Sequence, residues 1–129
     1  MEELHVPYRK RLGREPDFKV VYRFFGEHEG GRSSPPFQGY RSDFWYEDEE
    51  ERPGNIFMIW PEFLDEYGDV VLKVDHAVAV NGEAYMWVVN PDAMPYHRKH
   101  LRVGATGFFH EGARRVAECT VVQLIGLTA

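Results

Sequence analysis

The residues best suited to chemistry by type and spacing lie in the segment His97-Arg98-Lys99-His100, where two basic residues separate two histidines. Two imidazoles at this spacing can bind one metal ion, but a zinc site needs a third or fourth ligand fixed in place. No such ligand is evident in the sequence, so we expect no metal and no other cofactor. The segment is expected in an exposed loop, which either has no ligand or forms a basic rim that contacts a phosphate or a carboxylate.

A second group of candidates is a pair of arginines, Arg32 and Arg41, at the two ends of a loop. Two adjacent glycines before Arg32 adopt positive φ angles at little steric cost, so the chain can reverse tightly there. Exposed guanidinium groups make good bidentate contacts with phosphate. Alternatively, each arginine pairs with Glu29 or Asp43 and only holds the loop. The two interpretations are equally open for Arg32, and the second is favoured for Arg41.

A third group is the acidic run Glu47-Asp48-Glu49-Glu50-Glu51. Beside a phosphate backbone each carboxylate would add a repulsion of about 1 kcal/mol at 4 Å in water. The run is therefore expected to be either a solvated hairpin tip, which we favour, or a surface that docks a basic patch on a partner protein. A calcium loop is not favoured, because consecutive carboxylates lack the alternating spacing and the glycine turn of such loops.

The sequence offers no convincing catalytic group. Nucleotide-binding loops of the Gly-x4-Gly-Lys-Ser/Thr type are missing, so we expect no GTP binding or hydrolysis. Cys119 lies in the terminal apolar run, where we expect a buried and unreactive thiol. His76 is expected to be a buried structural histidine on the apolar face of a strand. We therefore predict that the protein is not an enzyme.

Composition narrows the class of protein. The chain has 129 residues, of which 15% are aromatic, and this suits a single domain with a real core. A net charge of −6 argues against general nucleic-acid binding, and we expect no DNA partner. The single cysteine excludes an intrachain disulfide and fits a reducing compartment. Because neither an export signal nor a membrane-length apolar stretch is present, the expected location is the cytoplasm.

Hydrophobic alternation predicts an all-β domain over residues 17–129, after an N-terminal arm of residues 1–16 that is not a helix. Pro61 is expected to end one strand, and Asn81-Gly82 is expected to form a two-residue hairpin turn. Frequent turns favour a closed antiparallel barrel or a sandwich. The predicted strands are residues 18–25, 40–48, 55–60, 69–80, 83–89, 101–109 and 113–127.

Three motifs resemble domain 3 of the elongation factor Tu family. The most specific is Glu29-Gly30-Gly31-Arg32-x-x-Pro35-x-Phe37-x-Gly39-Tyr40-Arg41-x-x-Phe44. Looser ones are Gly68-Asp69 with the following run to His76, Ala79 and Gly82, and Glu111-Gly112-x-Arg114-x-Val116. The resemblance implies a closed antiparallel barrel of about six strands. It also implies an extra hairpin or loop inserted near residues 82–100, and a role in translation without the family's GTPase domain.

The resulting prediction is a non-catalytic binding module that docks a partner protein. One alternative is an accessory protein that binds tRNA or another RNA through Arg32, as the resemblance implies. A second is a small metal-dependent enzyme with a site at the barrel mouth, built from His97, His100 and nearby carboxylates. The residues predicted to contact a partner are Gly30, Gly31, Arg32, Phe37, Tyr40, Arg41, Glu47, Glu49, Glu50 and Glu51.

Overall fold

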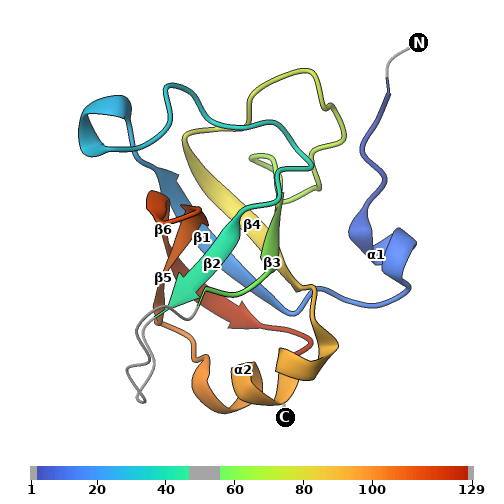
Figure 1. Cartoon of the computed structure of the whole chain (residues 1–129). Helices are drawn as coiled ribbons and strands as arrows, with labels where there is room; N and C mark the ends of the chain where they lie inside the picture. Colours follow the sequence, from blue (N-terminus) through green and yellow to red (C-terminus); the bar gives the residue numbers. More distant parts are fainter. Residues whose placement is uncertain (1–2, 47–55, 128–129) are drawn as a thin grey trace.

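The computed structural model describes residues 3–46 and 56–127, which form a single curled antiparallel sheet with short helices at its margins (Figure 1). The strand order is β2-β5-β6-β1-β4-β3. The predicted all-β class is therefore confirmed. The strands are β1 (Phe18–Phe24), β2 (Asp43–Tyr46), β3 (Ile59–Phe63), β4 (Asn81–Val88), β5 (Thr106–Glu111) and β6 (Arg114–Leu124). The helices are α1 (Tyr8–Leu12), η1 (Glu27–Glu29), η2 (Pro91–Ala93) and α2 (Met94–His100).

The core fills the concave side of the sheet. Strand β1 alternates as predicted, with Phe18, Val20, Tyr22 and Phe24 buried on one face. Burying a large apolar side chain stabilises a fold by roughly 1.5–3 kcal/mol, so this row of residues fixes the register of the central strand. Aromatic rings pack edge to face around it, including Tyr22 against Phe63 at a centroid distance of 5.3 Å.

The barrel is not closed, contrary to the prediction. The edge strands β2 and β3 do not form a ladder with each other. Between them lies one isolated bridge, in which Phe44 and Phe57 exchange two backbone hydrogen bonds of 2.8 Å. The Gln38 side chain continues this closure by bonding both the N–H and the carbonyl of Phe63 at 2.9 Å. A side-chain amide thus replaces the backbone of a missing strand pair and protects the β3 edge.

Pro61 lies inside β3 instead of ending it, so that prediction was wrong. Proline removes one backbone donor, which a central strand cannot tolerate but an edge strand can. Because β3 is the last strand of the sheet, it pairs only with β4, with Pro61 opposite Met86.

The segment predicted as the clearest strand, residues 69–80, is a loop. Its side chains do not alternate between core and solvent, since Leu72 and Val80 are both exposed. The His76 side chain is 70% exposed, so the expected buried histidine is also wrong. Its predicted partner, residues 83–89, belongs mostly to β4, whose two sides are already paired with β1 and β3. Its backbone instead bonds to several partners, among them Phe63, which accepts from the Val71 N–H.

Residues 82–100 do not form a hairpin or loop at the rim. Their first part belongs to β4, which lies between β1 and β3 in the sheet. Asn81 and Gly82 are strand residues opposite Arg23 and Tyr22, so the predicted hairpin turn at that dipeptide is wrong. The rest of the segment forms η2 and α2, which lie beyond one end of the sheet (Figure 1). That the segment is an insertion into a family fold stays a prediction.

Two predicted turns are confirmed. The hairpin between β5 and β6 reverses at Gly112, whose φ of 61° favours glycine. In the glycine pair before Arg32, Gly30 has a φ of 84°, whereas Gly31 does not have the positive φ that was predicted for both. Gly31 packs so closely on the preceding strand that an added Cβ would lie 2.2 Å from the carbonyl oxygen of Phe25. The glycine pair is therefore required by the fold itself.

The N-terminal arm contains a helix, contrary to the prediction. Helix α1 follows Pro7 and ends at Gly13 in the left-handed conformation. It lies beside β3 and β4, at the right of Figure 1. Within the described part of the chain, no helix combines the length and the apolar character needed to cross a bilayer.

Candidate binding site

Two tryptophans on the outer face of β3 and β4 form the base of the site. Trp60 and Trp87 are directly opposite in the antiparallel register. Such cross-strand pairs lie on the same face of a sheet, about 5 Å apart at their Cβ atoms. Trp87 is only 2% exposed although it lies outside the core, because the N-terminal arm packs over it. Trp60 remains part-exposed.

A buried carboxylate fixes the arm to the sheet. Glu62, on β3, is 1% exposed and accepts a hydrogen bond of 2.8 Å from the backbone N–H of Tyr8. It also accepts one of 3.2 Å from Nε1 of Trp87, and it lies 2.6 Å from Nε2 of His5. Buried carboxylates are stable only when they are hydrogen-bonded in this way. Helix α1 is therefore held in a defined position over the tryptophan pair.

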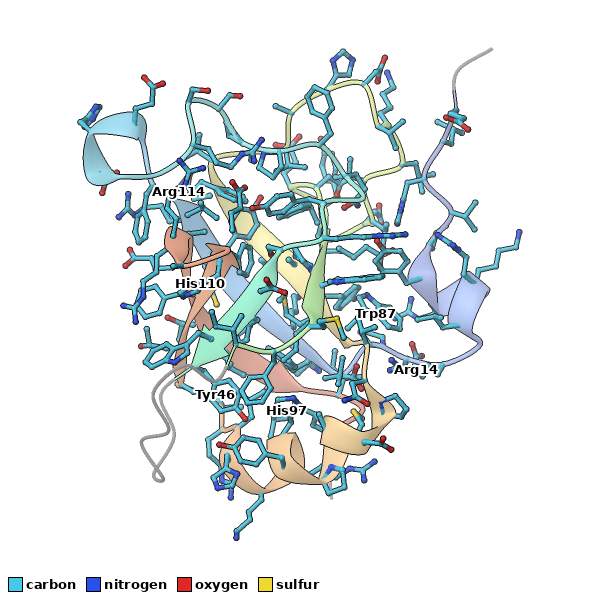
Figure 2. The ribbon with its side chains drawn as sticks, viewed as in Figure 1. Arg14, Tyr46, Trp87, His97, His110 and Arg114 are labelled. Carbon is cyan, nitrogen blue, oxygen red and sulfur yellow. The ribbon has the colours of Figure 1, made fainter. Side chains whose placement is uncertain are left out.

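Arg14 closes one side of the site and is fully engaged. Its Nη1 donates to both carboxylate oxygens of Asp17 at 3.0 Å, and its Nη2 donates to the Val88 carbonyl at 3.0 Å. The guanidinium also lies over the Trp87 ring, 5.3 Å from its centroid (Figure 2). Asp17 is buried and accepts a further hydrogen bond from the Val88 N–H. Arg14 thus has its charge compensated and serves the structure.

A cavity of about 460 Å³ lies between the arm, the tryptophan pair and the segment that leads into α2. Its walls are mainly apolar, formed by Trp60, Trp87, Leu12, Val89 and Met94. Cavities of this size and character accept small molecules or single large side chains. Its polar groups are Tyr8 and the guanidinium groups of Arg11, Arg14 and Arg41. We call this cavity the Arg–Trp pocket.

Arg41 and Arg11 differ from Arg14 in lacking a carboxylate partner among the residues that the structure describes. The Arg41 guanidinium stacks on Trp60, 4.5 Å from the ring centroid. Neither Arg41 nor Arg11 belongs to any ion pair formed among the described residues. Both are exposed to solvent at the pocket. Two positive charges that no described carboxylate pairs with therefore lie beside an aromatic wall.

Tyr8 lies within electrostatic reach of both cations. Burial is the main cause that raises the pKa of its hydroxyl, and the Glu62 carboxylate adds to that effect. The charges of Arg41 and Arg11, together with a hydrogen bond from Arg41, act in the opposite direction. Because the net direction of the pKa is upward, the hydroxyl stays protonated at neutral pH. Tyr8, Arg11 and Arg41 thus present hydrogen-bond donors to one region.

Arg32 and Arg41, at the two ends of one loop, face different parts of the structure. Arg32 turns toward the β5–β6 hairpin, where its Nη1 lies 2.5 Å from Oε2 of Glu111. The Tyr40 hydroxyl bonds the same carboxylate. Burial raises the pKa of Glu111, but these hydrogen bonds and one from Arg114 outweigh it, so the net pKa is lowered. Arg41 turns toward β3 and belongs to the Arg–Trp pocket.

The partners expected for these arginines were wrong. Glu29 instead pairs with Arg23 at 3.1 Å, and it also accepts from the Gly26 N–H. Arg32 instead pairs with Glu111 at the end of β5, next to His110, which lies opposite Asp43 in the sheet. The Phe37 side chain is exposed, and its backbone forms an isolated bridge with Ala77. The acidic residues Glu47, Glu49, Glu50 and Glu51 lie outside the described residues.

The predicted basic rim is contradicted at His97. This residue lies on α2 and is fully buried, with Nδ1 2.9 Å from the Tyr46 hydroxyl (Figure 2). Burial is the main cause that lowers the pKa of His97 to about 4, and the nearby His100 lowers it further. The segment is a helix and not a loop, so one face points inward and only Arg98 and Lys99 are exposed. His100 is half-buried, and its Nδ1 lies 2.9 Å from the Tyr96 carbonyl.

The residues considered for metal or thiol chemistry give no such site in the described ranges. Among residues 3–46 and 56–127, no group of three or more His, Cys, Asp or Glu residues is arranged to hold a metal ion. Cys119 is buried as predicted, and burial raises the pKa of its thiol to about 12. The thiolate form that would react is therefore scarce at neutral pH.

Comparison with protein-family models gave no match to this chain, and comparison with curated proteins gave none either. The similarity to domain 3 of elongation factor Tu therefore stays a prediction from sequence motifs.

Most of the Arg–Trp pocket escaped the sequence interpretation. Arg41 was named as a partner-binding residue, but Tyr8, Arg11 and Trp87 were not. The signal that was available is the alternation of β4, which places Trp87 opposite the core residues Met86 and Val88. A tryptophan on an outward position suggests that another element covers it. The basic N-terminal arm, which had no assigned place in the fold, was a candidate for this covering element.

Proposed function

We propose that this protein is a non-catalytic binding module that docks a partner protein in the Arg–Trp pocket. The observation that carries the proposal is a pair of cations beside the Trp60–Trp87 wall, Arg11 and Arg41, which form no ion pair within the described ranges. Tryptophan, tyrosine and arginine are the residues that most often dominate the binding energy of protein interfaces. They do so when they line a pocket that the partner fills and dehydrates.

Charge favours an acidic segment of the partner as the occupant. The whole chain carries a formal charge of −6, which repels acidic proteins at long range. Locally the pocket has the opposite sign, so an acidic segment is attracted there. Apolar side chains at that border, Leu12 and Val89, are exposed and available for contact. This combination fits a segment that carries both an acidic and an apolar group.

The groups lining the pocket support binding better than catalysis. Its polar side chains are arginines, which stay protonated, and Tyr8, whose pKa is raised by burial. None of these serves as a general base at neutral pH, whereas all of them donate hydrogen bonds. RNA binding through Arg32 has less support, because Arg32 is already engaged by Glu111.

The test compares proteins recovered from a lysate of the source cells by the wild-type protein and by the double variant Arg41→Ala/Trp60→Ala. The control is Arg98→Ala/Lys99→Ala, which removes two exposed cations from α2, away from the pocket. All samples are compared with and without ribonuclease. We expect a ribonuclease-resistant protein that the pocket variant loses and the control variant keeps.

Two results would contradict the proposal. Equal recovery by all three proteins would remove the pocket from the interaction. Recovery that disappears with ribonuclease would favour the RNA alternative instead, and it should then weaken steeply with salt and on Arg32→Ala.

A further inference from the structure

The Arg–Trp pocket has two parts of different chemistry. One part holds the donors of Arg41, Arg11 and Tyr8, which converge on one region. The other part is the apolar wall, in which Trp60 is part-exposed and Trp87 is only 2% exposed beneath the arm. A ligand that fits both parts carries a negative charge and a flat apolar body, joined at short range. The chemistry of that ligand can be specified more narrowly from the geometry of the cations.

Arg41 has the chemistry to bind a planar anion. Its guanidinium carbon lies 4.5 Å from the centroid of the Trp60 ring, and a guanidinium that packs on a ring can still donate hydrogen bonds from its N–H groups. A carboxylate is planar and accepts two parallel N–H bonds from such a group. Arg14 gives a related example within the same molecule, since it lies over Trp87 and donates from Nη1 to both oxygens of Asp17.

No described carboxylate pairs with Arg41 in the way that Asp17 pairs with Arg14. Arg14 and Arg41 each stack on one member of the tryptophan pair. Arg14 has an internal carboxylate, and Arg41 has none among the described residues. An external carboxylate that binds Arg41 would complete the same arrangement. Arg11, the second cation at the pocket that pairs with no described carboxylate, would strengthen its binding.

The apolar wall determines what the carboxylate is attached to. Indole faces favour a planar aromatic group, which gains offset or edge-to-face contacts beyond its apolar burial. A cavity of about 460 Å³ has space for one such ring with its acid group. We infer that the Arg–Trp pocket recognises an aromatic ring joined to a carboxylate, presented by an aromatic and acidic peptide segment. This inference rests on the proposed docking function and names the group that the partner inserts.

Small matched probes isolate each element of the inference. Phenylacetate has both the ring and the carboxylate, and phenylacetamide has the same shape without the charge. Cyclohexylacetate keeps the charge but loses the planar ring, and acetate has the charge alone. Titrations into the full chain at low salt should give the tightest binding for phenylacetate, by about tenfold over the amide, as expected for a charge-assisted bidentate contact.

Variants assign the binding to the pocket. Arg41→Ala should weaken phenylacetate binding about tenfold or more, and Arg41→Lys should recover only part of it, because lysine keeps the charge but not the planar fork. Arg98→Ala, with an exposed cation outside the pocket, should bind like the wild type. Arg41→Lys and thermal unfolding together exclude loss of fold as the cause. Equal affinities for phenylacetate and phenylacetamide, or for phenylacetate and acetate, would overturn the inference.

Peptide probes then test the source of the carboxylate. N-acetylphenylalanine presents a chain terminus, and N-acetyl-Glu-Phe-amide presents an internal acidic side chain. Tighter binding of either than of N-acetylphenylalaninamide supports a peptide ligand. If phenylacetate binds but neither peptide does, the peptide source is wrong. The lysate comparison tests docking separately: a pocket-dependent partner without binding of any probe would leave the proposed function standing and overturn this inference alone.

Discussion

Two arginine–tryptophan stacks lie on the same face of the sheet and differ in one respect. Arg14, which lies over Trp87, has its hydrogen-bond partners inside the molecule, and the Trp87 ring is almost completely buried. Arg41 over Trp60 is exposed and has no carboxylate partner within the described residues. The same pair of residue types therefore serves stability in one place and is available for binding in the other. What distinguishes them is the presence of an internal anion.

The strongest test of this comparison is Arg14→Ala. Removing the guanidinium leaves the buried Asp17 carboxylate without its cation, and we expect the free energy of unfolding to fall by about 3 kcal/mol. Denaturant titration measures this change. The control is Arg9→Ala, which breaks an exposed pair with Glu15 and should change stability by less than about 1 kcal/mol. Similar losses of stability for both variants would mean that the Arg14–Trp87 stack does not stabilise the fold.

The pH must be held near neutral for these measurements, because His97 makes the whole fold sensitive to acid. Its folded pKa of about 4 lies below the ordinary value of 6.5, so the unfolded chain binds the proton more readily. The contribution is fully present above pH 6.5 and is lost as the pH falls toward 4. Between pH 7 and pH 5 we expect a loss of about 2 kcal/mol.

Denaturant titrations at both pH values, in the wild type and in His97→Gln, test this origin. Glutamine does not titrate, so the variant should show a clearly smaller difference between the two pH values. An unchanged pH dependence would assign the effect to other groups.

Glu62→Gln tests the wall that the two stacks share. The substitution removes the charge that accepts from Tyr8 and Trp87, and we expect stability to fall by about 1–2 kcal/mol. Amide hydrogen exchange at Tyr8 should accelerate more than exchange in β1, because the arm is released before the sheet unfolds. A uniform acceleration across the chain would show that the arm is not a separate unit. Binding of phenylacetate should weaken in parallel with release of the arm.

The smallest effect on stability is expected for Arg41→Ala. Its guanidinium is exposed and has no carboxylate partner in the described part of the chain, so unfolding should change by no more than about 0.5 kcal/mol. The same variant should lose most of its affinity for phenylacetate. This opposition between stability and binding is what the comparison predicts. A loss of stability as large as that of Arg14→Ala would mean that the Arg41–Trp60 stack stabilises the fold as well.

The extent to which sequence predicted this molecule follows from how local each signal is. Strand β1 and the β5–β6 hairpin were predictable, because their alternation and the glycine at the turn act within a few residues. The loop 69–80 was not predictable, because both sides of its expected partner β4 are taken by β1 and β3, and the alternation of one segment does not reveal that competition. Pairing between distant segments overrides local propensity.

The site was harder to predict than the fold for the same reason. Arg14 finds the Val88 carbonyl, and Tyr8 finds Glu62, across more than fifty residues of sequence in each case. No local pattern records such contacts. Arg32 and Arg41 form one motif in the sequence, yet they face different elements of the structure. Both were predicted to contact a partner, but only Arg41 lines the Arg–Trp pocket.

The most direct test of the Arg41–Trp60 stack as the binding site is to follow the NMR signal of each indole N–H during titration with phenylacetate. Trp60 and Trp87 line the pocket, whereas Trp45 lies elsewhere, beneath Arg115 at 4.7 Å. We predict a saturable shift of the Trp60 signal and a smaller one for Trp87, whose N–H is held by Glu62. Trp45 should not move, and phenylacetamide should produce little change in any signal. Absence of a Trp60 shift, or an equal shift at Trp45, would contradict the assignment of the Arg41–Trp60 stack as the binding site.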